Sequence, residues 1–147
     1  MPEPGDPDCL FCRIVAGDAD ADAVIVLEES QAVGFLDHRP LFPGHTLLVP
    51  RVHYETLPDL PPDELEPYFK TVRLLARAVP EAVGAEGSFV AMNNVVSQSV
   101  PHLHVHVVPR VRKDGLRGFF WPRTKYESDE HAEETAEKIR AALGSLR

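Results

Sequence analysis

Three histidines alternate with apolar residues in the run His102-Leu103-His104-Val105-His106-Val107-Val108. In an extended strand this spacing places the imidazoles on one face, about 6–7 Å apart, and the apolar residues on the face that can be buried. A neutral imidazole is a good nucleophile toward phosphorus, and a neighbouring histidine can hold a ring nitrogen or protonate a leaving group. The run therefore indicates phosphoryl or nucleotidyl transfer.

Two other interpretations of this run stay open. The histidines would also suit a purely structural metal site, or a histidine-rich surface strand with no chemical role. Metal sites built from histidines on one face usually add a carboxylate, and none lies on this strand. Donors for phosphate oxygens are available just before the run, from Asn93, Asn94, Gln98 and Ser99.

The two cysteines of the chain stand close together, as Cys9-Leu10-Phe11-Cys12. In an intracellular chain a C-x-x-C pair is more often metal-binding or redox-active than a structural disulfide. No thioredoxin-like βαβ pattern surrounds the pair, which disfavours a redox role. A closed zinc site needs two further ligands, and reduced thiols without metal are the alternative.

The elements that must position these residues are mostly short strands. Hydrophobic periodicity and turn signals predict strands over residues 24–28, 32–36, 45–50, 88–93 and 101–109. One helix is expected to begin within 60–64 and to end at about Val79, before Pro80, and a second to span 129–143. This pattern predicts an α+β fold, with an antiparallel sheet of about five strands and two helices on one face.

Length and composition fit one packed domain, because the chain has 147 residues of which 44% are hydrophobic. Residues 1–8 are expected to be frayed, and residues 126–147 to form a C-terminal helical extension. No apolar run approaches the length of a membrane span, and the N-terminus lacks the features of a secretory signal. We therefore expect no membrane interaction and a cytoplasmic location.

The net charge of −8 argues against binding of a nucleic acid polymer, which usually requires a basic face. The charge is uneven, however, because six basic residues and a single acidic one lie between Arg110 and Lys125. This basic cluster is either a solvated loop or a local attractor for a phosphate-rich small substrate.

The run from His102 to Val108 resembles the signature of the histidine-triad (HIT) family of nucleotide hydrolases and transferases. Other segments resemble this family in the same order, namely Leu10–Ile14, Phe35–Asp37 and Gly44–His53. The resemblance covers residues 9–125, and it implies a single HIT domain for residues 1–147 and a homodimer in which the sheets of two subunits join.

The resemblance also implies catalytic roles. His104 would attack the α-phosphate of a nucleotide, and His106 would contact the phosphate and help to manage the leaving-group proton. His45 would orient the triad, although a core histidine is the alternative interpretation. The chemical step would need no metal.

Binding residues follow from the same resemblance. Asp37 matches a carboxylate that accepts hydrogen bonds from the ribose hydroxyls, with a turn or capping aspartate as its alternative. The base would lie in an apolar slot whose members could instead be core residues: Phe11, Ile14 and Phe35. The polar residues around the phosphate would be Asn93, Gln98 and Ser99.

Zinc is the cofactor that the resemblance implies. Some bacterial family members, and the related sugar-phosphate uridylyltransferases, bind zinc through C-x-x-C and two histidines. The matching histidines here are His53 and His102, so a structural zinc ion would be held by Cys9, Cys12, His53 and His102.

The chain departs from the family pattern just before the histidine run. Relatives usually carry a longer, glycine-containing loop where this chain has only Val95-Val96-Ser97. We therefore expect a different path around the leaving group. The segment Gly115–Pro122 is expected either to line the leaving-group side or to act as an aromatic plug in the core or at the dimer surface.

The expected activity is hydrolysis of a nucleotide, with adenosine as the nucleoside that the family favours. A nucleotidyl-histidine would form on His104, and water would release a nucleoside monophosphate. Candidate substrates are dinucleoside polyphosphates, nucleoside phosphoramidates and acyl-adenylates. Two alternatives remain, namely transfer to phosphate or a sugar phosphate, and a nucleotide-binding regulatory module with little turnover.

Overall fold

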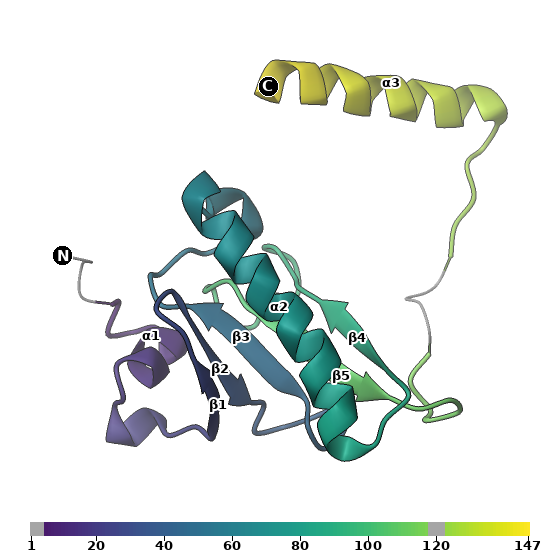
Figure 1. The fold of residues 1–147 in the computed structure, drawn as a ribbon. Helices are drawn as coiled ribbons and strands as arrows, with labels where there is room; N and C mark the ends of the chain where they lie inside the picture. The colour runs from purple at the N-terminus through teal and green to yellow at the C-terminus, as the bar shows by residue number, and fades with distance from the viewer. Residues whose placement is uncertain (1–4, 118–122) are drawn as a thin grey trace. The chain divides into compact units, whose positions relative to one another are not determined.

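The computed structural model describes residues 5–117 and 123–147, and the chain divides after Asp114 into two compact units. The first unit is built on one antiparallel sheet with the strand order β1-β2-β3-β5-β4 (Figure 1). Its strands are β1 (Ile25–Glu28), β2 (Ala32–Leu36), β3 (Thr46–Pro50), β4 (Gly87–Ala91) and β5 (Val105–Arg110). The expected α+β class and five-stranded antiparallel sheet are confirmed.

Three α-helices accompany the sheet along the chain: α1 (Leu10–Val15), α2 (Pro62–Val83) and α3 (Asp129–Leu146). Short 3-10 helices span Ala19–Ala21 and Leu57–Asp59. The helix α1 was not expected from the sequence, because its six residues are too few to show an amphipathic period. The helix α3 belongs to the second unit, and none of its residues is buried.

The expected end of α2 at Val79 is wrong, since the helix continues through Pro80 to Val83. A proline inside a helix removes its own N–H, but the following residues can still donate. The helix ends at Gly84, whose φ of 68° is left-handed and whose N–H donates to the Pro80 carbonyl. The termination signal is therefore the glycine cap and not the proline.

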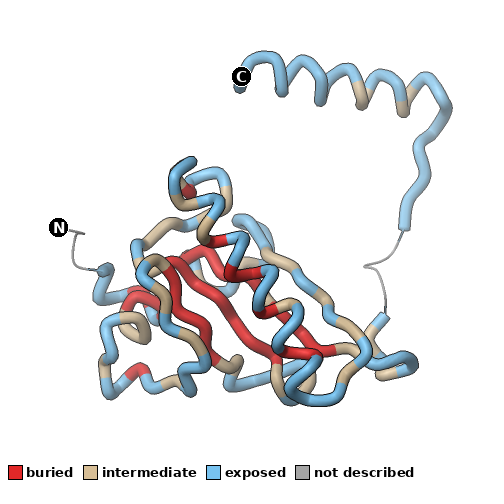
Figure 2. The backbone as a smooth tube through the Cα atoms, in the orientation of Figure 1, coloured by how far each residue is buried: buried red, intermediate tan, exposed pale blue. Residues whose placement is uncertain are grey.

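The central strands of the sheet are buried along most of their length (Figure 2), and their buried residues belong to two clusters, one on each face. Alternate residues such as Leu48, Val105 and Val107 pack with the apolar side of α2. The opposite face presents residues such as Val33, Phe35 and Leu47 to the cysteine-bearing segment around α1. The expected helix over residues 60–79 covers one face of the sheet as α2, and α1, which was not expected, packs on the opposite face.

The expected strand over residues 101–109 is only partly correct. It begins at Val105, so His106 lies in β5 whereas His102 and His104 lie in the irregular segment before it. The pairing of β3 with β5 runs from Thr46–Val107 to Leu48–Val105. Two residues further along β3, Pro50 would lie opposite Leu103, but Pro50 has no N–H, and Leu103 donates its N–H to the Tyr54 carbonyl instead.

No helix within residues 5–117 and 123–147 is long and apolar enough to cross a membrane.

The tight loop that leads into β3 depends on Gly44. Its φ of +101° lies in a region that residues with a side chain rarely adopt. A Cβ atom at this position would lie 3.2 Å from Val83 Cγ1 and 3.4 Å from Pro109 Cγ. Gly44 therefore sets the entry of the chain into β3 and the position of His45.

We predict that Gly44→Ala lowers the free energy of unfolding by about 1–3 kcal/mol, because it combines backbone strain with a close contact. Urea unfolding followed by circular dichroism measures the change. Gly87→Ala is the matched control, since nothing lies within 4 Å of a Cβ built there. Equal stability of the two variants would contradict the role assigned to Gly44.

Candidate active site and metal centre

The ring of His104 is buried and held by the backbone that precedes it. Its Nδ1 lies 2.8 Å from the carbonyl oxygen of His102. A carbonyl can only accept, so Nδ1 carries the proton and Nε2 carries the lone pair. Burial lowers the pKa of His104 from its ordinary value, against the opposing effect of the carbonyl of His102 and of Asp37. The ring is therefore neutral near pH 7, with Nε2 able to act as a nucleophile.

His106 and His45 form a pair beside His104. His45 Nε2 and His106 Nδ1 are 3.0 Å apart, and the rings of His104 and His106 meet edge to face with centroids 5.0 Å apart. Burial lowers the pKa of His106 to about 4, and it also lowers the pKa of His45. The structure therefore brings together the three histidines expected to be catalytic, all in the neutral form.

Asp37 joins the histidine pair at the end of β2. Its Oδ2 lies 3.7 Å from His45 Nε2, while its Oδ1 accepts the N–H of Arg39 at 2.9 Å. Its backbone N–H donates to the His45 carbonyl. The carboxylate thus accepts a hydrogen bond within a turn, as one interpretation of the sequence held, and also lies beside the histidines expected to be catalytic.

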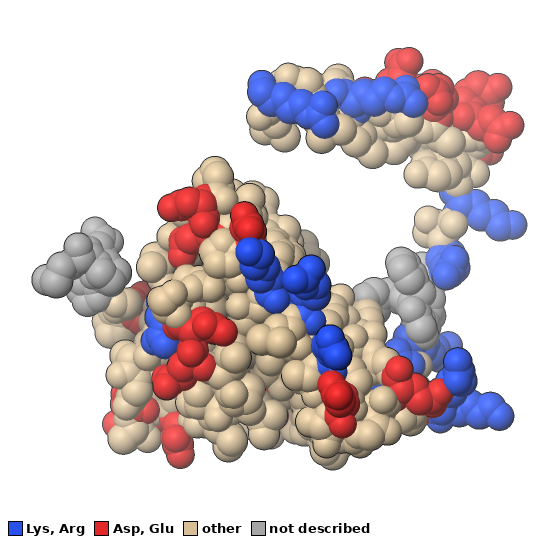
Figure 3. All heavy atoms as spheres, in the orientation of Figure 1, with Lys and Arg blue, Asp and Glu red and all other residues tan. Residues whose placement is uncertain are grey.

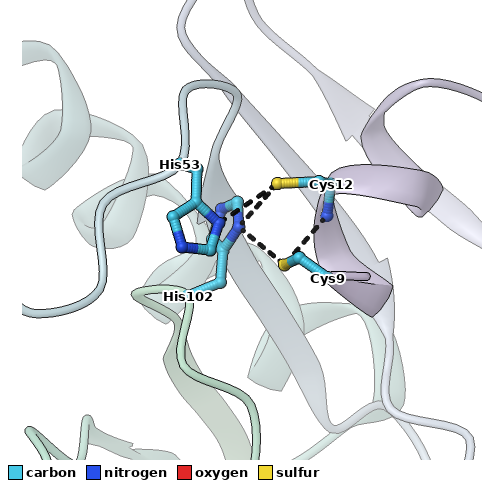
Figure 4. Close-up of side chains that lie close together, drawn as sticks. All are labelled: Cys9, Cys12, His53 and His102. Atoms are coloured by element: carbon cyan, nitrogen blue, oxygen red, sulfur yellow. Dashed lines mark hydrogen bonds between the residues drawn. The ribbon is translucent and has the colours of Figure 1, made fainter. Parts of the chain in front are cut away.

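The four residues expected to bind metal converge between α1, the loop after β3 and the segment before β5 (Figure 4). Cys12 Sγ lies 3.2 Å from His53 Nδ1 and 3.5 Å from His102 Nδ1, and Cys9 Sγ lies 3.4 Å from His102 Nδ1. All ligand atoms lie within 4.8 Å of one another. Three of the four residues are buried.

This metal cluster, Cys9, Cys12, His53 and His102, has the dimensions of a tetrahedral zinc site. Ordinary Zn–S and Zn–N bonds at a tetrahedral angle place sulfur and nitrogen ligands about 3.5 Å apart. His102 Nε2 donates to the Pro50 carbonyl at 2.8 Å, which leaves the lone pair on the Nδ1 that faces the thiols. Burial raises the pKa of the Cys12 thiol to about 11, so a cation is what would draw off its proton. The residues therefore fit zinc.

The three residues expected to form the base slot lie together where α1 packs on the sheet. Phe11 meets Phe35 edge to face at 5.4 Å and meets His104 at 5.0 Å between ring centroids. Both phenylalanines are buried, and Ile14 is partly buried against the same cluster. The two phenylalanines therefore pack in the core, and Phe11 also contacts the ring of His104.

The polar residues expected around the phosphate lie in the loop between β4 and β5. The Asn93 side chain donates to the Ser97 carbonyl. The Gln98 side chain accepts from Val95 N–H and donates to the Glu55 carbonyl. Ser99 is exposed in the same loop. Two of the three side chains are therefore engaged in holding the loop.

The shortened stretch of this loop adopts left-handed backbone conformations without glycine. Val95 has a φ of 71° and Ser97 a φ of 61°, and a β-branched residue rarely adopts such values. The Gln98 amide stabilises this conformation, because it accepts a hydrogen bond from Val95 within the loop and donates one to Glu55 outside it. A path that differs from that of relatives stays a prediction.

Two arginines of the basic cluster between Arg110 and Lys125 have acidic partners. Arg110 forms a bidentate pair with Asp114, and Arg112 pairs with Glu86. Residues 118–122 of the expected leaving-group segment Gly115–Pro122 lie outside the described residues. On the face shown in Figure 3, acidic and basic side chains of the first unit are interspersed.

Sequence reasoning missed the backbone groups that orient the imidazoles, namely the carbonyls of Pro50 and His102 and the N–H of Leu41. Leu41 N–H donates to His45 Nδ1 at 3.0 Å. Main-chain groups leave no mark in the residue types. The available signal was indirect, since Pro40, Pro43 and Gly44 are typical of a loop before His45.

Comparisons with known proteins agree with this geometry. The model of the HIT domain matches residues 18–113. An adenosine 5'-monophosphoramidase of Schizosaccharomyces pombe is 30% identical over 137 residues, which are 90% of this chain and 98% of the relative. An adenylylsulfatase of Arabidopsis thaliana is 30% identical over 146 residues, which are 95% of this chain and 71% of the relative.

A solved structure of a zinc-bound protein is also similar to this chain. The crystal structure of a zinc-bound histidine triad family protein from Mycobacterium smegmatis has 37% sequence identity and a TM-score of 0.69, and the match covers 95% of each chain. The family model spans more than half of this chain. The chain therefore belongs to the HIT family.

Proposed function

We propose that the chain is a nucleotide hydrolase that cleaves at the α-phosphate through a nucleotidyl-histidine on His104. The observation that carries this proposal is the hydrogen bond from His104 Nδ1 to the His102 carbonyl. It holds a buried, neutral imidazole with its Nε2 lone pair available beside His106. Family membership supports nucleotide hydrolysis at a coarse level, since relatives of this chain include hydrolases.

In the first step, His104 Nε2 attacks the α-phosphorus, and the bond between phosphorus and the leaving group breaks with its electrons departing on that group. His106 donates a hydrogen bond toward the phosphate or the leaving group, where negative charge grows. In the second step, water attacks phosphorus and the bond to His104 breaks. Overall, one water molecule adds OH to phosphorus and H to the leaving group.

Adenosine-containing compounds are the proposed substrate class. Two relatives are named as an adenylylsulfatase and an adenosine 5'-monophosphoramidase, both of which act on an adenylyl group. We assign ribose binding to Asp37, and contact with the base to the apolar group of Phe11, Ile14 and Phe35. Asn93, Gln98 and Ser99 are assigned to the phosphate side. The homodimer and the cytoplasmic location stay predictions.

We predict that His104→Ala abolishes a covalent adenylyl adduct and lowers kcat by at least about a thousandfold, because the nucleophile itself is lost. Intact-protein mass spectrometry after mixing with a panel of adenosine phosphoramidates, dinucleoside polyphosphates and acyl-adenylates detects the adduct. The substrate that forms it fastest defines the leaving group.

His131→Ala is the control for this experiment, because His131 lies in α3 of the second unit. It should form the adduct as the wild type does. Undiminished turnover in His104→Ala would sink the mechanism. Product that carries added phosphate or sugar phosphate would favour transfer over hydrolysis, and binding of AMP without any cleavage would favour a regulatory module.

We also infer that the metal cluster holds a structural zinc ion. The ligand distances, the burial of the site and the lone pair of His102 support this proposal, as does a zinc-bound relative. Bound zinc would fix the segment around α1 to the residues before β5 and would take no part in the chemical step.

We predict about one zinc ion per chain in the wild type and a clear loss in His53→Ala, since three ligands hold zinc more weakly than four. Elemental analysis of the purified protein measures the metal content. A chelator should lower the Tm of the wild type more than that of His53→Ala, because only bound metal adds stability through mass action.

His38→Ala is the matched control, since the His38 side chain is 84% exposed and is not part of the metal cluster. It should retain wild-type zinc and the wild-type response to chelator. Folded wild-type protein that takes up no added zinc, with both thiols reactive, would establish the metal-free interpretation instead.

A further inference from the structure

Asp37, His45 and His106 form a second cluster of metal-type ligands, whose ligand atoms all lie within 4.8 Å of one another. Such a cluster can be a cation site or a hydrogen-bonded network with ordered protons. The two differ in where the imidazole protons lie, because a metal needs lone pairs and a network needs alternating donors and acceptors. The hydrogen bonds around the cluster decide between them.

The first of these bonds comes from the backbone of the loop before β3. Leu41 N–H donates to His45 Nδ1, with nitrogen atoms 3.0 Å apart. A backbone amide can only donate, so Nδ1 of His45 must present its lone pair. The neutral ring therefore carries its proton on Nε2. The carboxylate of Asp37, with Oδ2 3.7 Å from this Nε2, favours the same arrangement.

The second bond passes this order on to His106. His45 Nε2 and His106 Nδ1 are 3.0 Å apart. Since His45 Nε2 carries a proton, it donates a hydrogen bond to His106 Nδ1. The proton of the neutral His106 ring therefore lies on Nε2. A cation between the rings would need the lone pair of His45 Nε2, which would put a proton on Nδ1, facing Leu41 N–H. The geometry therefore disfavours a metal here.

We propose that the backbone amide of Leu41 is a positioning group that makes His106 present an N–H, and not a lone pair, to the substrate phosphate. This inference rests on the proposed function of the same site. His104 and His106 then differ in their Nε2 atoms. The His102 carbonyl leaves a lone pair on Nε2 of His104, whereas the Leu41 amide places a proton on Nε2 of His106.

The division suits attack on an anionic phosphate. A lone pair is required at the attacking nitrogen, but a second lone pair beside it would repel the phosphate oxygens. An N–H donor there attracts the charge that develops in the transition state. The hydrogen bond to His45 comes from the main chain of Leu41, and the Leu41 side chain is largely exposed. The side chain is therefore not part of this network.

The direct test is nitrogen NMR of the 15N-histidine-labelled wild type near neutral pH, with no substrate present. Two-bond couplings between ring protons and nitrogens identify each tautomer. His45 and His106 should carry their protons on Nε2, and His104 on Nδ1. A proton on Nδ1 of His106 in the wild type would overturn the proposal, and this readout requires no variant to fold.

A pair of variants at Leu41 tests the consequence for rate. Leu41→Pro removes the N–H, whereas Leu41→Ala keeps it and removes the side chain. Loss of one hydrogen-bond donor to the charge that develops in the transition state costs about 10²–10³ in kcat. Part of the Leu41→Pro population would still carry the proton on Nε2 of His106. We therefore expect Leu41→Pro to lower kcat at least about tenfold. Leu41→Ala keeps the N–H, so it should lower kcat clearly less than Leu41→Pro does.

His45→Gln supplies a rescue that separates proton order from general loop damage. A glutamine amide has a fixed oxygen acceptor and N–H donor, so it can accept from Leu41 and donate to His106. It should keep His106 in the Nε2–H tautomer, whereas His45→Ala should not. An unchanged tautomer and kcat in Leu41→Pro would contradict the proposal. The expected tautomers in a protein that cleaves no adenylyl compound would instead overturn the proposed function alone.

Discussion

The hydrogen bond between His104 Nδ1 and the carbonyl oxygen of His102 is the constraint on which the site depends. It fixes the tautomer and the direction of the attacking ring, and it requires the backbone at His102 to stay in place. Two contacts of the His102 ring keep it there, one to the Pro50 carbonyl and one to the thiols of Cys9 and Cys12. The position of His104, the proposed nucleophile, is thus set by the end of β3 and by α1.

The sheet supplies the dry surroundings that keep the histidines neutral. Its α2 face is filled by apolar side chains, while the opposite face shares its apolar layer with α1 and the histidines. Phe11 covers His104, and the resulting burial lowers the pKa values of His104 and His106. Removing water also strengthens any interaction with phosphate, because charges interact more strongly at low dielectric.

Much of the fold could be predicted from the sequence, because apolar alternation reports which side chains are buried. Leu103, Val105 and Val107 are fully buried, as their spacing indicated. The start of β5 could not be predicted, since it depends on where Pro50 falls in the register. The metal cluster followed from the family resemblance. The proton order did not, because it is set by main-chain groups that have no signature in residue type.

His102 serves two sites at once, through its ring toward the cysteines and through its carbonyl toward His104. Such sharing makes the two sites epistatic. A substitution of a proposed metal ligand would shift the backbone at His102, whose carbonyl holds the His104 ring. The effects of changes in the two sites are therefore not expected to be additive. A redesign of either site therefore has to treat both as one unit.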